Sequence, residues 1–129
     1  MKTIFTLIIL LISATATMAQ NSIDELFETY QGIGDVKFTS AIERNPETHE
    51  VVKVVKKIES EAISSNSFIK AFKREASKAQ TTNQTERNGE MTYVLVFENE
   101  KQIRLYSLRY YKDDKLLVNA SIIIKYIKH

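Results

Sequence analysis

The sequence predicts an α+β domain: a mostly antiparallel five-stranded sheet with one main helix packed on one face and a short N-terminal helix. Two segments carry apolar residues at helical spacing. The C-terminal third alternates between apolar and polar residues, and the turns within it are too short to connect parallel strands. The predicted order is helix, two strands, helix, three strands (α-β-β-α-β-β-β).

Residues 1–19 have the layout of a secretory signal peptide. Lys2 supplies a positive start, residues 4–12 are apolar apart from one threonine, and residues 17–19 (TMA) resemble a small-residue cleavage site. The apolar run is too short to span a membrane, which takes about 20 residues; the alternative is an uncleaved N-terminal anchor. We expect cleavage after residue 19, which leaves residues 20–129 as one periplasmic or secreted domain with no membrane span.

Residues 22–30 (SIDELFETY) predict the short N-terminal helix, because their apolar residues fall at helical spacing. Ser22 is expected to cap the helix, and Asp24 and Glu25 suit the positive end of its dipole. Two glycines shortly after Tyr30 end it.

Residues 36–58 leave two interpretations open. Residues 36–44 alternate as a strand does, and the following NPETH, residues 45–49, fits either a helix start or a type I turn with His49 in the left-handed position. Residues 50–58 match helical spacing, yet four valines in five positions favour a strand. Pairing Arg44 with Glu50 puts the apolar residues of both segments on one face, so we favour the hairpin. That register leaves one mismatch, Lys56 opposite Phe38.

Residues 64–80 are the clearest helix in the sequence. One side is apolar and the other is basic, which is typical of a helix with one buried and one solvated face. The apolar side consists of Phe68, Ile69, Phe72, Ala76 and Ala79. Residues 80–90 (QTTNQTERNGE) contain no apolar residue and predict a flexible loop.

Residues 91–98, 101–111 and 115–127 predict three antiparallel strands joined by short polar turns, which fix the register. Pairing Glu98 with Lys101, and Lys112 with Lys115, gives one face that is almost purely aliphatic. We expect the helix over residues 64–80 to pack on that face. Its members are Val94, Val96, Ile103, Leu105, Val118, Ala120, Ile122 and Ile124.

The opposite face of the same strands, here called the tyrosine face, mixes tyrosines and an arginine with aliphatic residues. Its members are Tyr93, Leu95, Phe97, Arg104, Tyr106, Leu108, Tyr110, Leu117, Asn119, Ser121 and Ile123, with Tyr93 expected across from Tyr106. The N-terminal helix covering it, a partner or second copy binding it, and a small-ligand groove are all open alternatives. Because Tyr and Arg anchor many interfaces, we predict Tyr93, Arg104, Tyr106 and Tyr110 as partner-binding residues.

No catalytic or metal-binding motif stands out. The chain has no cysteine, and its two histidines, His49 in the predicted turn and His129 at the end, have no partner at metal-ligand spacing. The adjacent Asp113 and Asp114 suit a turn. A formal net charge of +2 gives no strong field for nucleic acid. We therefore expect no enzyme activity, no cofactor, no metal and no nucleic-acid partner.

The sequence ends its signal in MAQ, then has IDELF in the first helix, an NPET turn, an amphipathic helix and a tyrosine-rich meander. This layout resembles the small exported proteins of unknown function common in gut Bacteroidetes. The resemblance implies a periplasmic or outer-surface location in a Gram-negative cell and supplies no catalytic residues.

The function predicted is a non-catalytic binding module that uses the tyrosine face for a protein or peptide partner or for self-association. One alternative is an inhibitor of a secreted hydrolase such as a protease, which would present the turns at residues 45–49 and 99–100. Another is a small ligand-binding protein, which needs a pocket between the sheet and the first helix.

Overall fold

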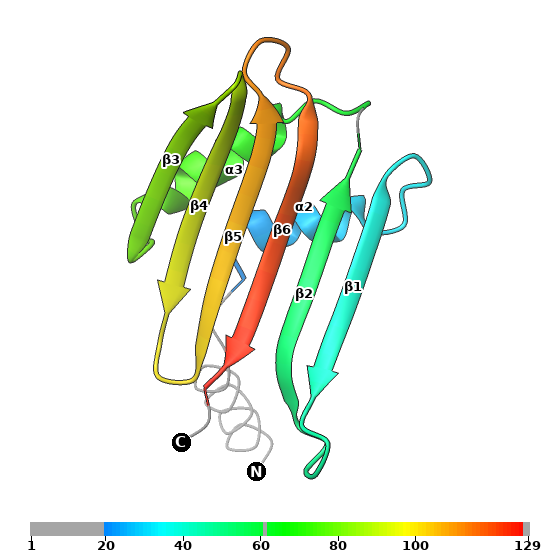
Figure 1. Ribbon diagram of the computed structural model, residues 1–129, viewed down its shortest axis with the longest axis vertical. Helices are drawn as coiled ribbons and strands as arrows, with labels where there is room; N and C mark the ends of the chain where they lie inside the picture. Colours follow the sequence, from blue (N-terminus) through cyan, green and yellow to red (C-terminus); the bar gives the residue numbers. More distant parts are fainter. Residues whose placement is uncertain (1–19, 61, 128–129) are drawn as a thin grey trace, which may run out of the picture.

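The computed structural model describes residues 20–60 and 62–127, in which six antiparallel strands form one sheet with two helices on one side (Figure 1). The elements are α2 (Ser22–Tyr30), β1 (Lys37–Arg44), β2 (Val51–Glu59), α3 (Asn66–Ala76), β3 (Thr81–Arg87), β4 (Glu90–Glu98), β5 (Gln102–Tyr111) and β6 (Leu117–Tyr126). The order across the sheet is β1-β2-β6-β5-β4-β3. The predicted signal peptide lies outside the described residues, among which no helix has the length and apolarity needed to cross a membrane.

The predicted α+β class is confirmed, with one strand more than expected. The segment predicted as a loop over residues 80–90 contains the edge strand β3, which pairs with β4 from Thr81 opposite Val96 to Arg87 opposite Glu90. All seven residues of β3 are exposed. An edge strand forms through backbone hydrogen bonds to a single neighbour, and charged or polar side chains protect such an edge from further pairing. The absence of apolar residues therefore misled the prediction.

Helix α2 has the predicted bounds, but Asn21 rather than Ser22 caps it. The Asn21 side chain accepts hydrogen bonds from the backbone N–H groups of Ile23 and Asp24. The Asp24 carboxylate accepts the Asn21 N–H at 2.9 Å, which completes a reciprocal capping box. Ser22 does not cap the helix, and its backbone N–H donates a hydrogen bond to Glu75 of α3.

The hairpin interpretation of residues 36–58 is confirmed, with a register two residues away from the predicted one. Phe38 faces Ile58, and Lys56 faces Ser40, so the predicted mismatch between Lys56 and Phe38 disappears. A bulge between Glu43 and Arg44 absorbs part of the difference. His49 has the left-handed backbone expected of it, with φ of 62°.

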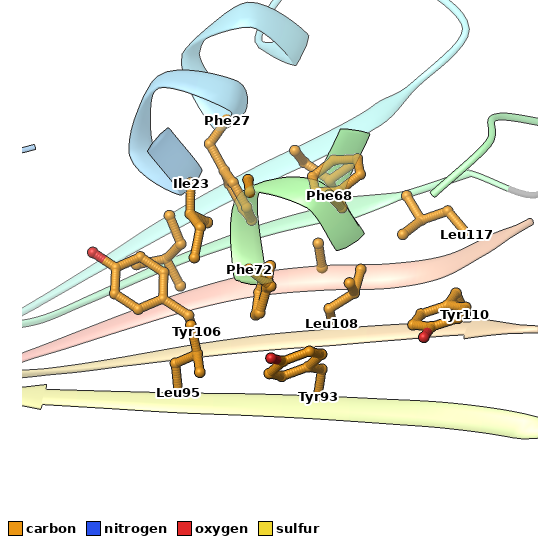
Figure 2. Packing of buried hydrophobic residues seen from close by; sticks show 14 of the residues in the cluster. Ile23, Phe27, Phe68, Phe72, Tyr93, Leu95, Tyr106, Leu108, Tyr110 and Leu117 are labelled. Carbon is orange, nitrogen blue, oxygen red and sulfur yellow. The ribbon is translucent and has the colours of Figure 1, made fainter. Parts of the chain in front are cut away.

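Helices α2 and α3 cover the tyrosine face, which corrects the prediction that the main helix packs on the aliphatic face (Figure 2). The rings of Phe27 and Phe68 meet edge to face at 6.1 Å, and Phe72 lies 5.6 Å from Tyr93. Large aromatic side chains fill the space between a helix layer and a sheet better than valines do, since they bury far more area per residue. The core therefore forms where the rings are.

From Asn119 onward, strand β6 presents the opposite set of residues from the one predicted, whereas Leu117 lies on the predicted face. Tyr106 faces Ile122, so Ile122 is buried on the tyrosine face and Ile123 lies on the other side. The cause is a bulge opposite Arg109 and Tyr110, because one extra residue in a strand exchanges its two faces. Within β4 and β5 the predicted faces are right, but Tyr93 faces Leu108 rather than Tyr106.

Candidate functional site

The four residues predicted to bind a partner are all buried on the side of the sheet that the helices occupy. The exposed fractions are 6% for Tyr93, 8% for Arg104, 0% for Tyr106 and 4% for Tyr110. Figure 2 shows Tyr93 and Tyr106 on the side of the sheet that the helices occupy, and Tyr110 on the same side next to Leu117. Coverage by the first helix, one of the open alternatives, is what the structure shows, and α3 shares in it. Tyr93 lies against Phe72 of α3, and Arg104 and Tyr106 hydrogen-bond to Asp24 of α2. The role of these four residues in binding a partner stays a prediction.

Arg104 and Tyr106 hold α2 to the sheet through Asp24. Arg104 Nη1 lies 3.1 Å from Asp24 Oδ2 and 3.3 Å from the Tyr106 hydroxyl, which itself donates to Asp24 Oδ1 at 3.0 Å. Burial and the neighbouring Asp24 charge raise the pKa of Tyr106 to about 12, against the opposing effect of Arg104. The phenol is thus a protonated donor at ordinary pH.

The hydrogen-bonding groups beside this trio are only partly satisfied. Arg104 Nε and both polar atoms of the Gln102 side chain are buried and have no hydrogen-bond partner among the residues that the structure describes. An unmade hydrogen bond at a buried polar group costs about 1–3 kcal/mol. Gln102 is 1% exposed and precedes Arg104 by two residues on β5, so both belong to the same face of the sheet. This end of the core therefore contains polar groups that the fold itself does not use.

A second buried acid, Glu75, links α3 to the start of α2. The Ser22 N–H donates to Glu75 Oε2 at 3.0 Å, the Ser22 hydroxyl donates to the same oxygen, and Lys78 Nζ lies 3.7 Å from the other oxygen. Burial raises the pKa of Glu75, but the Ser22 hydrogen bonds and the Lys78 charge outweigh burial, so the pKa lies below its ordinary value. Glu75 thus occupies the positive end of α2 as an ionised carboxylate.

A hollow of about 480 Å³ lies between these two clusters, and we call it the polar hollow. The start of α2, the second half of α3 and the sheet all contribute to its wall. Its lining comprises Gln20, Asn21, Ser22, Glu25, Arg74, Glu75, Lys78, Phe97, Arg104 and Tyr106. This is the place, between the sheet and the first helix, where the ligand-binding alternative requires a pocket. Nowhere in residues 20–60 and 62–127 do three or more His, Cys, Asp or Glu side chains gather to hold a metal ion.

The sheet side opposite the helices, called here the open face, is crossed by one aliphatic row. Successive cross-strand partners place Val55 next to Ile123, Ile123 next to Leu105, and Leu105 next to Val96. These four partly exposed residues are the aliphatic band. The two described helices lie on the other side of the sheet (Figure 1). The face on which the main helix was expected is therefore left uncovered by the described helices and strands.

Polar residues flank the aliphatic band on both sides. One neighbouring row is mostly small and uncharged, with Thr39, Lys57, Ser121 and Ser107 in succession. The other row carries both signs of charge, with Glu43, Lys53 and Lys125 on one half and Glu98 beyond Ile103 on the other. The open face thus combines an apolar centre with a polar rim, the composition that protein interfaces share.

Comparison with known proteins supplies a family for the chain. The model of a domain of unknown function, DUF5024, matches residues 20–123. The chain belongs to the DUF5024 family. No curated protein matches it. A solved structure, that of ORF14 from Sulfolobus islandicus filamentous virus, aligns with 91% of this chain and 94% of its own, at 12% sequence identity and a TM-score of 0.37.

Sequence reasoning missed the roles of Asp24 and Glu75 in this DUF5024 domain. Asp24 was assigned to the helix dipole alone, and Glu75 was not singled out. The spacing of both acids along their helices indicates that they lie on the buried side. Asp24 is next to Ile23 and three residues before Phe27, and Glu75 follows Phe72 by three residues. An acid on the buried stripe of a helix needs a partner from another element.

Proposed function

We propose that this DUF5024 domain is a non-catalytic, exported interaction module whose open face binds a second copy of the chain. The observation that carries the proposal is the aliphatic band, four partly exposed side chains in a row on a side of the sheet that neither described helix covers. Antiparallel sheets with one solvated face usually place polar residues there. An apolar row on such a face favours a binding surface.

The aliphatic band is close to symmetric, which favours a second copy as the occupant. The centre of the strand order falls between β6 and β5. A two-fold axis there, parallel to the strands, lays Ile123 over Leu105 of the second copy and Val55 over Val96 of the second copy. Apolar residues then meet apolar residues along the whole row. Two-fold interfaces require this self-complementarity, and face-to-face sheets pack with nearly aligned strands.

The flanking rows fit the same arrangement in part, because the axis lays Lys57 over Val94 and Lys125 over Ile103 of the second copy but also forms two complementary pairs. The axis brings Lys53 over Glu98 of the second copy, which pairs opposite charges at the rim. Ser121 lies over Ser107 of the second copy, where small side chains allow the sheets to approach. Apolar burial contributes about 25 cal/mol per Å², offset by the entropic cost of association, so we expect a dissociation constant of roughly micromolar size.

Export and the absence of catalysis belong to the proposal. Residues 1–19 have the layout of a signal peptide, and the family match begins at residue 20, where the mature chain would start. The layout resembles that of small exported proteins of gut Bacteroidetes. The two buried acids are engaged, Asp24 with Arg104 and Glu75 with Ser22. This engagement supports a structural role for them rather than acid–base catalysis.

Light scattering on residues 20–129 over a range of concentrations tests the proposal. We expect the mass to rise from one chain to two as concentration increases. Leu105→Lys places a charge at the centre of the aliphatic band and should hold the protein as a monomer. Thr29→Lys, which introduces the same charge at an exposed position of α2 on the other side of the sheet, should leave dimerisation intact. A wild-type chain that stays monomeric at millimolar concentration contradicts the proposal.

The inhibitor alternative has one supporting observation of its own. The turn between β1 and β2 and the turn between β4 and β5 lie at the same end of the sheet (Figure 1). Inhibitors of secreted hydrolases that use a sheet scaffold present their turns in this way. Exchanging residues 45–49 for a neutral turn should abolish inhibition of a target hydrolase and leave the solution mass unchanged, which separates the two functions.

A further inference from the structure

We propose that the polar hollow is a binding site for a small organic monocarboxylate with an apolar body. Three elements build the hollow, and its lining combines cationic groups with two aromatic rings. A volume of about 480 Å³ falls in the range of small-molecule sites, which are about 300–1,000 Å³.

Arg104 supplies the buried recognition group. Its side chain is 10% exposed and lines the hollow. Among the described residues, both hydrogen bonds that it donates come from Nη1, to Asp24 and Tyr106, and Nη2 donates none. A guanidinium presents five N–H donors in a planar fork suited to a carboxylate. Arg104 therefore has donors left for a ligand.

The charges around Arg104 set the ligand's charge. Glu75 is engaged with Ser22 and Lys78, whereas Arg74 forms no ion pair among the described residues. Arg74 and the remaining donors of Arg104 thus favour an anion. Glu25, an exposed carboxylate of the lining, opposes a second negative charge.

The aromatic side of the hollow favours an apolar or aromatic body for the rest of the ligand. Phe97 packs edge to face on Tyr106, with ring centroids 5.4 Å apart, and both rings line the hollow. An apolar or aromatic body fits against this wall while its carboxylate reaches the arginines. Phenylacetate is the simplest probe of this chemistry, and phenylacetamide is its uncharged match.

Calorimetric titration of residues 20–129 with the two probes tests the site. We expect phenylacetate to bind and phenylacetamide to bind at least tenfold more weakly. Arg74→Gln, at an exposed position of α3, should weaken phenylacetate binding about two- to fivefold, the size expected of one exposed charge contact. Lys73→Gln, an exposed α3 residue outside the lining, should leave binding unchanged.

Arg104→Lys is the second variant, and it keeps the charge while removing the planar fork. With folding verified by circular dichroism, we expect it to lose phenylacetate binding. Three results overturn the proposal: no binding of phenylacetate at millimolar concentration, equal affinity for the acid and the amide, or equal effects of Arg74→Gln and Lys73→Gln. None of these results depends on the dimer, because Leu105→Lys should bind phenylacetate as the wild type does.

Discussion

Asp24→Ala is expected to be among the most destabilising single changes in this domain. The carboxylate is 8% exposed and accepts hydrogen bonds from Arg104 at 3.1 Å, Tyr106 at 3.0 Å and the Asn21 N–H at 2.9 Å. Its removal leaves the Arg104 guanidinium buried without a counter-charge, which costs about 3–5 kcal/mol. Loss of the capping contact adds about 1 kcal/mol.

Urea unfolding followed by circular dichroism measures this effect. A loss of about 4–6 kcal/mol is a large share of the roughly 5–15 kcal/mol that holds a domain folded, and the chain has no disulfide to compensate. Asp24→Asn retains acceptor capacity for Tyr106 and should cost about half as much. The control is Glu25→Ala, one residue further along α2 and exposed, which should change stability by less than about 0.5 kcal/mol.

A double variant separates the ion pair from the helix cap. Asp24→Ala combined with Arg104→Met removes both charges, and we expect it to be more stable than Asp24→Ala alone, because an unpaired buried charge no longer exists. Equal stabilities for Asp24→Ala and Glu25→Ala would refute the assigned role of the buried pair.

Three other changes test the titrating groups and the first turn. The pKa of Tyr106 is raised from 10.0 to about 12. Its contribution to the free energy of unfolding, about 3 kcal/mol, is therefore full below pH 10 and is lost as pH rises toward 12. Tyr106→Phe should remove this alkaline loss of stability, measured by urea unfolding at each pH. The pKa of Glu75 is lowered from 4.5, so its contribution to stability is present above that pH and declines as pH falls through the lowered value. Glu75→Gln should therefore reduce the loss of stability at acid pH. An unchanged acid loss would contradict this role. His49 has φ of 62°, so His49→Gly should raise stability by up to about 1 kcal/mol and His49→Val should lower it by about 1–2 kcal/mol in thermal melts; the reverse order would be inconsistent with a left-handed turn.

The predicted strands and helices were recovered because their patterns are local. Alternation over residues 91–98 and 101–111 is clean, so the faces of β4 and β5 were assigned correctly. The β6 assignment failed because Ile122, Ile123 and Ile124 are all apolar, and period-two reasoning cannot decide which of them points inward. A single bulge in the pairing of β5 with β6 places Ile122 on the buried face.

The face of the sheet on which the helices pack could not be predicted from the sequence, for a different reason. Both faces of the meander carry enough apolar residues to form a core, and the aliphatic face was chosen because it has fewer polar groups. Tyr106 and Arg104 look like poor core residues when taken alone. Both can be buried because the Asp24 carboxylate of α2 accepts their hydrogen bonds. That contact joins residues about 80 positions apart in the sequence.

The candidate sites show the same division between local and distant information. The residues of the aliphatic band were all visible in the sequence, but the cross-strand row that aligns them required the order β2-β6-β5-β4, in which β2 neighbours β6. The polar hollow required the placement of α2 beside α3. Neither follows from the spacing of residues along the chain.

Cysteine cross-linking tests the central claim, face-to-face pairing of two chains through the aliphatic band, most directly. The native chain has no cysteine, so Val55→Cys and Val96→Cys introduce the only thiols. Within one chain β2 and β4 are separated by β6 and β5, at about 4.8 Å per strand, too far for an internal disulfide. Because facing sheets lie about 10 Å apart, the two-fold pairing predicts that the double variant forms covalent dimers with a short bismaleimide, which reaches across the interface but not from β2 to β4, and that Val55→Cys alone does not. Failure of the double variant to cross-link, or equal cross-linking of the single variant, would contradict the account.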